Sequence, residues 1–299
     1  MSVNMRQSDS WGKFLERLGW RMHRTSFGAN IAIHPFPFGN LVKVQRPPLL
    51  KKEDLEEIDR VCLENRAMFV KVDSNYGQDT KVLEEAGYAL SVVPLSPPST
   101  IWVSLEKPEA ELWKDVSRSG KYSIKRAQRA GIKVEYYRNP SLDKLQTYYK
   151  EVLKPTGKKK KFYVPPFKQL VYMLEAFGDS SFLILGRNKD GDIVGGGFYV
   201  GNEDQVLYVH GGTTEIGRKI DAGHGVLWKS ILYFKKIGYK NLDFEGKDDP
   251  RFPDFTRGWG GFSYFKEKFG GQVIEFPYPY VKFMNPLLKQ VSEKLSLPF

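Results

Sequence analysis

A lysine set among aromatic residues is the most informative feature near the C-terminus. Lys266 follows Tyr264 and Phe265, and the pair Gly270-Gly271 comes shortly after it. An amine that attacks an ester or thioester builds negative charge on the carbonyl oxygen, and a preorganised cation beside that oxygen is often the largest catalytic contribution. Aromatic neighbours desolvate the cation in part and strengthen its field, while glycines let backbone segments approach closely. The run indicates an acyl-transfer site, with a surface lysine above an aromatic core as the alternative.

Polar residues on two neighbouring segments are candidates to contact a substrate. Asp243 and Glu245 alternate with apolar residues in the run 241–246, so a strand there would turn both carboxylates to one face. They are expected either to orient an incoming amine or to form ion pairs. Tyr208 and His210 lie in a second strand-like run, where His210 is expected either to hydrogen-bond substrate or to have a structural role.

Two basic segments account for the net charge of +11. Residues 118–133 hold no acidic residue, and Lys121, Lys125 and Arg129 recur every four residues, which places them on one helix face. Residues 150–168 hold seven lysines against one glutamate. Such local basicity indicates surfaces that bind an anion, with solvated surface as the alternative.

The overall composition is that of a soluble globular chain, and its 299 residues favour two domains over one. The single cysteine, Cys62, excludes an intrachain disulfide and a cysteine-based zinc site, and four scattered histidines make a poor metal set. Cys62 is expected to be a buried thiol. No stretch approaches the ~20 apolar residues of a membrane span, and the N-terminal residues lack an apolar signal-peptide core. A cytoplasmic location is therefore expected.

Turn signals and apolar periodicity predict an α/β chain with mixed sheets, arranged as two lobes packed together. Residues 1–107 are expected to form the first lobe and residues 108–283 the second, with a helix over 284–299 returning to the first lobe. One helix is expected to contain both Leu112 and Ala127. Three strands, a helix and a fourth strand follow between residues 182 and 245, an order that resembles the acyltransferase core of the GNAT family.

The C-terminal run also resembles a known family, the FemABX peptidoglycan-bridge aminoacyltransferases. Members carry a Phe-Lys-x-x-Phe-Gly ending after such a strand, and Phe265 and Lys266 match it position for position. The resemblance covers most of the chain and is strongest over residues 117–134 and 205–271. It implies two GNAT-like lobes, and the absence of a long Lys/Glu-rich insertion resembles the compact members that have no coiled-coil arm.

The resemblance further implies roles for individual residues. Lys266 would stabilise the transition state and Phe265 would contact the aminoacyl end of the tRNA. Trp11 and Lys13 are similar to an N-terminal run of the family in which a lysine holds the diphosphate of the precursor. Residues expected to line the acceptor site are Tyr208, His210, Asp243 and Glu245.

Phosphate contacts are implied for both basic segments. The second lobe of the family opens with a basic helix, so phosphate contacts are expected from Lys121, Lys125, Arg126 and Arg129. The family also has a loop with an arginine that grips precursor phosphate, but this arginine is missing near Tyr163. A run of four lysines, expected in a loop, is the candidate replacement for this arginine: Lys158, Lys159, Lys160 and Lys161.

The reaction implied by the resemblance is transfer of an amino acid from aminoacyl-tRNA to the side-chain amine of a peptidoglycan precursor peptide. No metal and no organic cofactor are expected. The expected partners are aminoacyl-tRNA and a nucleotide- or lipid-linked muropeptide, with peripheral contact with the inner membrane surface left open.

Two other classes of protein remain open at this point. An acyl-CoA-dependent GNAT N-acyltransferase would bind the CoA diphosphate at a helix N-terminus. Gly223 and Gly225 fit the end of its loop pattern, but Ile220 stands where arginine or glutamine is usual. A non-catalytic RNA-binding protein would use the basic segments and would have no need of the Phe-Lys ending.

Overall fold

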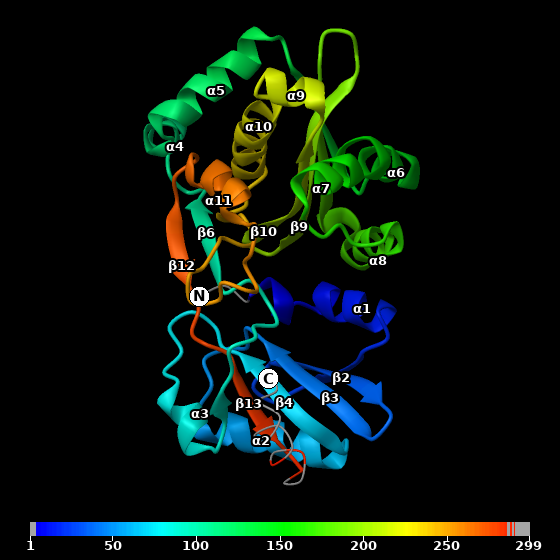
Figure 1. Cartoon of the computed structure of the whole chain (residues 1–299), viewed down its shortest axis with the longest axis vertical. Coiled ribbons are helices and arrows are strands. Elements are labelled where there is room, and N and C mark those ends of the chain that lie inside the picture. The colour runs from blue at the N-terminus through cyan, green and yellow to red at the C-terminus, as the bar shows by residue number, and fades with distance from the viewer. Residues whose placement is uncertain (1–3, 286–287, 289, 291–299) are drawn as a thin grey trace.

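The structure, a computed structural model, describes residues 4–285, 288 and 290 of the chain. It confirms the expected α/β class, because the strands form two mixed sheets, of six and seven strands, that lie in separate lobes (Figure 1). The helix expected over residues 284–299 falls almost entirely outside the described residues.

The sheet of the first lobe is antiparallel except for one central parallel pair, β3 and β4. Helices α2 (Lys52–Glu64) and α3 (Lys81–Glu85) supply Leu55 and Leu83 to the core on one of its faces, where Cys62 is fully buried as expected. In spatial order its strands are β1 (Arg21–Arg24), β2 (Asn30–Phe36), β3 (Gly39–Gln45), β4 (Ala67–Asp73), β13 (Tyr280–Phe283) and β5 (Ala89–Leu90).

The first helix joins the two lobes. Helix α1 (Asp9–Arg17) follows the short 3-10 turn Met5–Gln7 and begins at Ser8, whose hydroxyl accepts a hydrogen bond from the Trp11 amide at 3.1 Å. It packs against β1 and β2 of its own lobe and against α8 of the second lobe (Figure 1). Phe14 and Leu15 thereby enter a hydrophobic core that belongs mainly to the second lobe.

The second sheet is likewise mixed, with β10 and β11 as its parallel pair. Alternate residues of its strands face two separate cores: Leu183 and Phe198 point to one, Phe182 and Tyr199 to the other. In spatial order the strands are β12 (Gln272–Glu275), β6 (Ser99–Ser104), β11 (Asn241–Asp243), β10 (Gln205–Thr213), β9 (Ile193–Asn202), β8 (Ser181–Arg187) and β7 (Lys133–Arg138).

Helices cover both faces of this sheet. The expected order of three strands, a helix and a fourth strand is present as β8, β9, β10, α10 and β11, with the short additional helix α9 between β10 and α10. The helices are α4 (Glu109–Asp115), α5 (Arg118–Arg129), α6 (Leu142–Tyr148), α7 (Lys154–Lys160), α8 (Phe167–Phe177), α9 (Glu215–Lys219), α10 (Ala222–Lys236) and α11 (Gly260–Glu267), with a π-helical turn at Tyr149–Leu153 and a 3-10 turn at Gly178–Ser180. The longest helix in the described part of the chain is α10, so no coiled-coil arm is present there.

Two local expectations are wrong. The helix expected to contain both Leu112 and Ala127 is divided into α4 and α5, because Ser117 has extended backbone and caps a new helix by accepting a hydrogen bond from the Gly120 amide at 3.1 Å. The lysine run expected in a loop is helical as far as Lys160, and Lys161 ends it in the left-handed conformation. Pro155 lies in the first turn of α7, where its missing N–H costs little.

Each sheet takes one strand from across the expected boundary between the lobes. Strand β6 falls within residues 1–107 but pairs with β11 and β12 of the second sheet. Strand β13 falls within residues 108–283 but pairs with β4 and β5 of the first sheet. The chain therefore crosses between the lobes more than once. None of the helices in the described residues is long and apolar enough to cross a bilayer.

The glycine pair after α11 allows the close backbone approach that its sequence predicts. Gly270 and Gly271 have φ angles of 74° and 97°. A Cβ atom on Gly271 would stand 2.6 Å from the carbonyl oxygen of Trp102 on β6, and one on Gly270 would stand 2.8 Å from that of Asp115. The end of α11 is therefore pressed against β6 and α4, which fixes the helix that carries Lys266.

Three glycine-to-alanine variants separate the effect of a positive φ angle on stability from the effect of the close contact with Trp102. Gly258 has a φ of 82° but open space where a Cβ atom would stand, whereas Gly261 has neither constraint. We expect Gly258→Ala to lower the free energy of unfolding by about 1–2 kcal/mol and Gly271→Ala to lower it further. Gly261→Ala, in the first turn of α11, should leave it unchanged or raise it slightly, because alanine favours helix over glycine. Urea unfolding midpoints measure the series, and equal midpoints for Gly258→Ala and Gly271→Ala would contradict the close contact with Trp102.

Candidate active site

Lys266 is a buried ammonium at the junction between α11 and the end of β11. Its residue is 7% exposed. Its Nζ donates hydrogen bonds to the carbonyl oxygens of Glu245 at 2.8 Å and Gly246 at 2.7 Å, and it lies 4.4 Å from the centroid of the Phe262 ring. An ammonium has three N–H donors, so one donor is left for a further acceptor. The lysine is therefore held by backbone carbonyls and keeps a hydrogen bond to offer.

Burial sets the ionisation of this lysine. Desolvation lowers the pKa of Lys266 from 10.5 to about 7, although the nearby carboxylates of Glu245 and Asp243 oppose the shift. At neutral pH the group thus lies close to its midpoint, where a small change in its surroundings changes its charge. Such a poised group in a mostly apolar setting is typical of functional sites.

Asp243 and Glu245 do not share one strand face, because β11 ends at Asp243. Asp243 is buried and accepts hydrogen bonds from the Thr100 hydroxyl, the Trp102 indole and the Glu245 amide. Burial, together with the nearby Glu245, raises the pKa of this carboxyl. With three donors already in place, Asp243 organises the junction, and its expected contact with the incoming amine stays a prediction.

Glu245 connects the junction to the first lobe. Its φ of 51° places it in the left-handed region, which is strained for a residue with a side chain. Its carboxylate forms an ion pair with Arg6, whose residue is 8% exposed and comes from the turn before α1. Of the two roles expected for Glu245, the structure contains the ion pair. Its role in orienting an amine stays a prediction.

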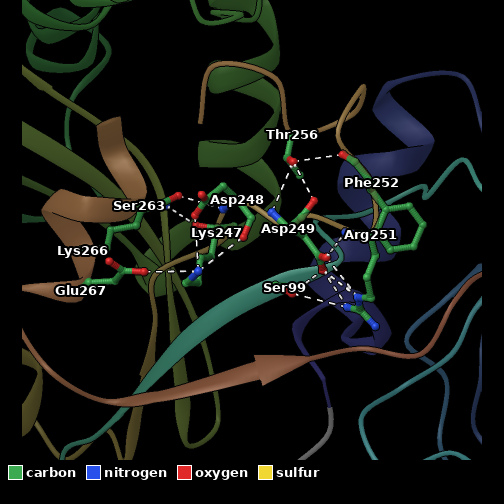
Figure 2. Close-up of polar contacts among 11 residues, drawn as sticks. Ser99, Lys247, Asp248, Asp249, Arg251, Phe252, Thr256, Ser263, Lys266 and Glu267 are labelled. Carbon is green, nitrogen blue, oxygen red and sulfur yellow. Dashed lines mark hydrogen bonds and ion pairs between the residues drawn. The ribbon is translucent and has the colours of Figure 1, made fainter. Parts of the chain in front are cut away.

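A polar clamp holds the loop between β11 and α11 (Figure 2). The Ser263 hydroxyl accepts the Asp248 amide at 2.8 Å, and Lys247 forms an ion pair with Glu267 at 3.2 Å. Further along, Asp249 forms an ion pair with Arg251 at 2.7 Å. Ser99 and Thr256 complete this clamp through hydrogen bonds to Asp249. The clamp fixes the backbone whose carbonyls receive Lys266.

The clamp is not predicted by the local sequence patterns. Its signal is the polar run at residues 247–251, in which Asp249 is followed two residues later by Arg251. Short runs of this kind are common in surface turns, where aspartate hydrogen-bonds the backbone two residues on. Only the tertiary structure brings Ser99 of β6 to the same carboxylate, at 2.5 Å.

Phe265 lies beside the start of α10. Its ring meets that of His224 edge to face at 4.9 Å and that of Phe269 at 5.4 Å. The Nε2 atom of His224 is buried and has no hydrogen-bond partner among the described residues. Burial, with a contribution from Lys268, lowers the pKa of His224 to about 4, so this ring is neutral at pH 7. His224 is a second residue that the sequence analysis did not single out.

Four expected substrate contacts lie on two other elements. Trp11 and Lys13 are on α1. The Trp11 ring is half-buried, and the guanidinium carbon of Arg6 lies over it, 5.2 Å from the ring centroid. Lys13 is exposed and lines a shallow hollow together with Arg17 and Glu175. Tyr208 and His210 are on β10. Tyr208 stacks on Tyr199 at 4.9 Å, which makes it part of the core of the second lobe.

His210 follows an irregularity in the pairing of β10 with β9, between residues 208 and 210. Burial lowers the pKa of His210 to about 4, so it is neutral at pH 7. Its backbone carbonyl accepts the Tyr148 hydroxyl at 3.0 Å. The imidazole is therefore available as a neutral donor or acceptor, and both roles expected for it remain predictions.

The two basic segments form separate helices, α5 and α7. On α5, Lys125 and Arg129 are exposed, whereas Lys121 donates to the Lys114 carbonyl at 3.0 Å and Arg126 pairs with Asp221 at 3.4 Å. Lys125 and Arg129 are thus the members of this helix that are best placed to meet an external anion. On α7 and its C-cap the exposed lysines are Lys158, Lys159, Lys160 and Lys161.

Among the residues that the structure describes, no group of three or more histidine, cysteine, aspartate or glutamate side chains could hold a metal ion. Burial raises the pKa of the Cys62 thiol to about 12, so a thiolate is disfavoured there.

Comparison with solved structures identifies the fold. FemX aligns with a TM-score of 0.81 at 16% identity, over 97% of this chain and 94% of its own. The C-terminal domain of a putative lysylphosphatidylglycerol synthetase from Agrobacterium fabrum aligns with a TM-score of 0.65 at 12% identity, covering 99% and 95%. A tandem GNAT protein from the clavulanic acid biosynthesis pathway aligns with a TM-score of 0.53 at 10% identity, covering 96% and 98%.

These likenesses show the fold alone. The expected resemblance to the FemABX family, with two GNAT-like lobes, is confirmed at that level. No protein-family model and no curated protein sequence matches the chain.

The lowered pKa of Lys266 predicts a pH dependence of stability. As pH rises from 7 towards 10.5, this lysine becomes mostly neutral in the folded protein while it stays mostly protonated in the unfolded chain. Unfolding then takes up a proton, so this group makes stability rise with pH. The free energy of unfolding of Lys266→Met minus that of the wild type should therefore fall steadily from pH 7 to pH 10.

Urea unfolding at several pH values measures this difference. Lys229→Met, which removes an exposed lysine from α10, controls for the loss of one positive charge. The same pH profile in Lys229→Met and Lys266→Met would contradict the assignment of the effect to the buried ammonium.

Proposed function

We propose that this protein is an aminoacyltransferase that moves an amino acid from aminoacyl-tRNA to the side-chain amine of a peptidoglycan precursor peptide. The observation that carries the proposal is Lys266, which matches the lysine of the FemABX ending and is buried with one N–H to spare. The FemX-like fold over 97% of the chain supports the same assignment.

In the proposed reaction, the neutral acceptor amine attacks the ester carbonyl carbon of the aminoacyl-tRNA. A carbon–nitrogen bond forms and negative charge gathers on the carbonyl oxygen. Protonated Lys266 donates its remaining N–H to that oxygen, and the preorganised carbonyls of Glu245 and Gly246 keep the ammonium in place. The carbon–oxygen bond to the ribose then breaks, and the amine proton passes to the departing ribose oxygen.

Phe265 and α5 supply the proposed contacts to the tRNA. The half-buried ring of Phe265, beside the neutral His224, offers an aromatic surface for the terminal base. Exposed Lys125 and Arg129 provide charge for the phosphates. On the acceptor side, Lys13 on α1 and the lysines of α7 are the proposed phosphate contacts.

The start of α10 weighs against the acyl-CoA alternative. A CoA diphosphate would bind at this helix N-terminus, where backbone N–H groups favour an anion. Here Asp221 occupies the N-cap position and places a carboxylate at that end, where it pairs with Arg126 at 3.4 Å. Because a tandem GNAT protein has a similar fold, the acyl-CoA-dependent class is tested in parallel.

A transfer assay decides between the classes. Labelled aminoacyl-tRNA pools are offered with nucleotide- and lipid-linked muropeptides, beside a reaction with labelled acetyl-CoA. We expect label to move from tRNA to a muropeptide. Transfer from acetyl-CoA alone would identify an ordinary N-acyltransferase, and tRNA binding without any transfer would favour an RNA-binding protein.

Lys266→Met is expected to lower turnover by about 10² or more, the effect of losing one oxyanion donor. Single-turnover rates with saturating substrates measure the chemical step. Lys229→Met serves as the matched control and should retain normal turnover. Near-normal turnover in folded Lys266→Met would remove this lysine from the mechanism.

Binding of tRNA should depend steeply on salt concentration. Each phosphate contact that is lost lowers the slope of log K against log salt by about one unit. The double variant Lys125→Met/Arg129→Met should therefore bind tRNA more weakly and with a slope smaller by about two. Lys52→Met, on α2 of the other lobe, is the control, and an unchanged slope in the double variant would place tRNA elsewhere.

A further inference from the structure

Two lysines lie side by side on the face of the first sheet that is turned away from α2 and α3. Lys43 of β3 is in register with Lys71 of β4 in the parallel pair. Their neighbours Val42 and Val70 belong to the core under α2, so the alternation of the strands directs both lysines to the opposite face. Adjacent strands lie about 4.8 Å apart, which brings two like charges close together.

Neither lysine forms an ion pair in the part of the chain that the structure describes. Lys71 is 5% exposed, and its side chain makes no hydrogen bond and no ion pair there. Lys43 is half-buried, and its Nζ lies over the ring of Trp20, at 4.0 Å from the centroid. Burial lowers the pKa of both lysines to about 8, so both are mostly protonated at neutral pH.

The surrounding charges neutralise the pair only in part. Arg6 adds positive charge near Lys43 but is committed to Glu245. Asp73 lies close enough to favour the charged lysines, yet its carboxylate accepts the Leu95 amide at 3.1 and 3.2 Å and forms no ion pair with any described residue.

A second arginine adds to the imbalance. Arg46, 2% exposed, donates to the backbone carbonyls of Ser74 at 2.6 Å and Pro97 at 2.8 Å. It forms no ion pair with any described residue, although the carboxylates of Asp73, Glu245 and Asp243 lie close enough to favour its charge. A buried charge without a partner is costly. Four cations, Arg6, Lys43, Arg46 and Lys71, thus stand near three carboxylates, Asp73, Asp243 and Glu245, and an incoming anion would offset the remaining positive charge.

We propose that Lys43 and Lys71 bind a carboxylate of the acceptor peptide. The identity of the acceptor rests on the proposed function. A carboxylate fits better than a phosphate dianion, because the desolvation of an ion grows with the square of its charge and this face is largely buried. Arg6, whose charge acts on Lys43, pairs with Glu245, and the backbone carbonyl of Glu245 accepts Lys266, so a carboxylate held here would lie on the acceptor side of the reacting amine.

Binding of a small acceptor mimic tests the site without any transfer reaction. The probes are Nα-acetyl-lysyl-alanine, which has a side-chain amine and a carboxylate, its C-terminal amide, and inorganic phosphate. Each is titrated into the full-length protein by NMR at constant ionic strength. We expect the carboxylate form to bind at least tenfold more tightly than the amide, and phosphate to compete poorly.

Two variants test whether Lys43 and Lys71 cause the preference for the carboxylate form over the amide. Lys71→Met and Lys43→Met should each reduce the preference for the carboxylate form at least fivefold, whereas Lys52→Met, an exposed lysine of the same lobe, should retain it. Equal affinity of the wild type for acid and amide would overturn the proposal, as would a preference that survives in both folded variants. Tighter binding of phosphate than of the carboxylate form would overturn it as well and assign the cluster to a phosphate.

The two proposals fail in different ways. Transfer from tRNA together with equal binding of acid and amide would leave the aminoacyltransferase function standing and reject the carboxylate site. Discrimination between acid and amide without transfer from tRNA would support the carboxylate site and reject the proposed donor.

Discussion

The buried ammonium of Lys266 imposes the constraint on which the rest of the site depends. A lysine in this setting must have acceptors, because a buried donor left unpaired costs more than a hydrogen bond contributes. The acceptors are backbone carbonyls, so their positions depend on the path of the chain after β11. The left-handed Glu245, the clamp around Asp249 and the glycine pair after α11 all serve to fix that path.

The two lobes act as one unit through a shared interior. Phe14 and Leu15 of α1 are buried among residues of the second lobe, and Arg6 ties the same segment to Glu245. A shift of one lobe against the other would therefore disturb both a hydrophobic core and the backbone that holds Lys266. Rigid union of this kind suits a reaction whose donor and acceptor must meet at one carbonyl carbon.

Local sequence patterns were enough to predict the α/β class, the strand order around α10 and Lys266 as the candidate catalytic cation, because each has a local signal. They failed where a single side chain overrides periodicity, as at Ser117, whose cap divides one expected helix into two. They also failed where partners are remote in sequence. Arg6 and Glu245 are 239 residues apart, and the register that sets Lys43 beside Lys71 appears only when β3 and β4 pair.

The exchange of strands between the lobes bears on how the chain is made. Strand β13, at Tyr280–Phe283, lies between β4 and β5 in the first sheet, although nearly the whole second lobe separates it from them along the chain. On a ribosome, β4 and β5 emerge long before their shared neighbour. The first lobe must therefore wait with open strand edges, which are templates for wrong pairing, until β13 arrives and pairs with both β4 and β5.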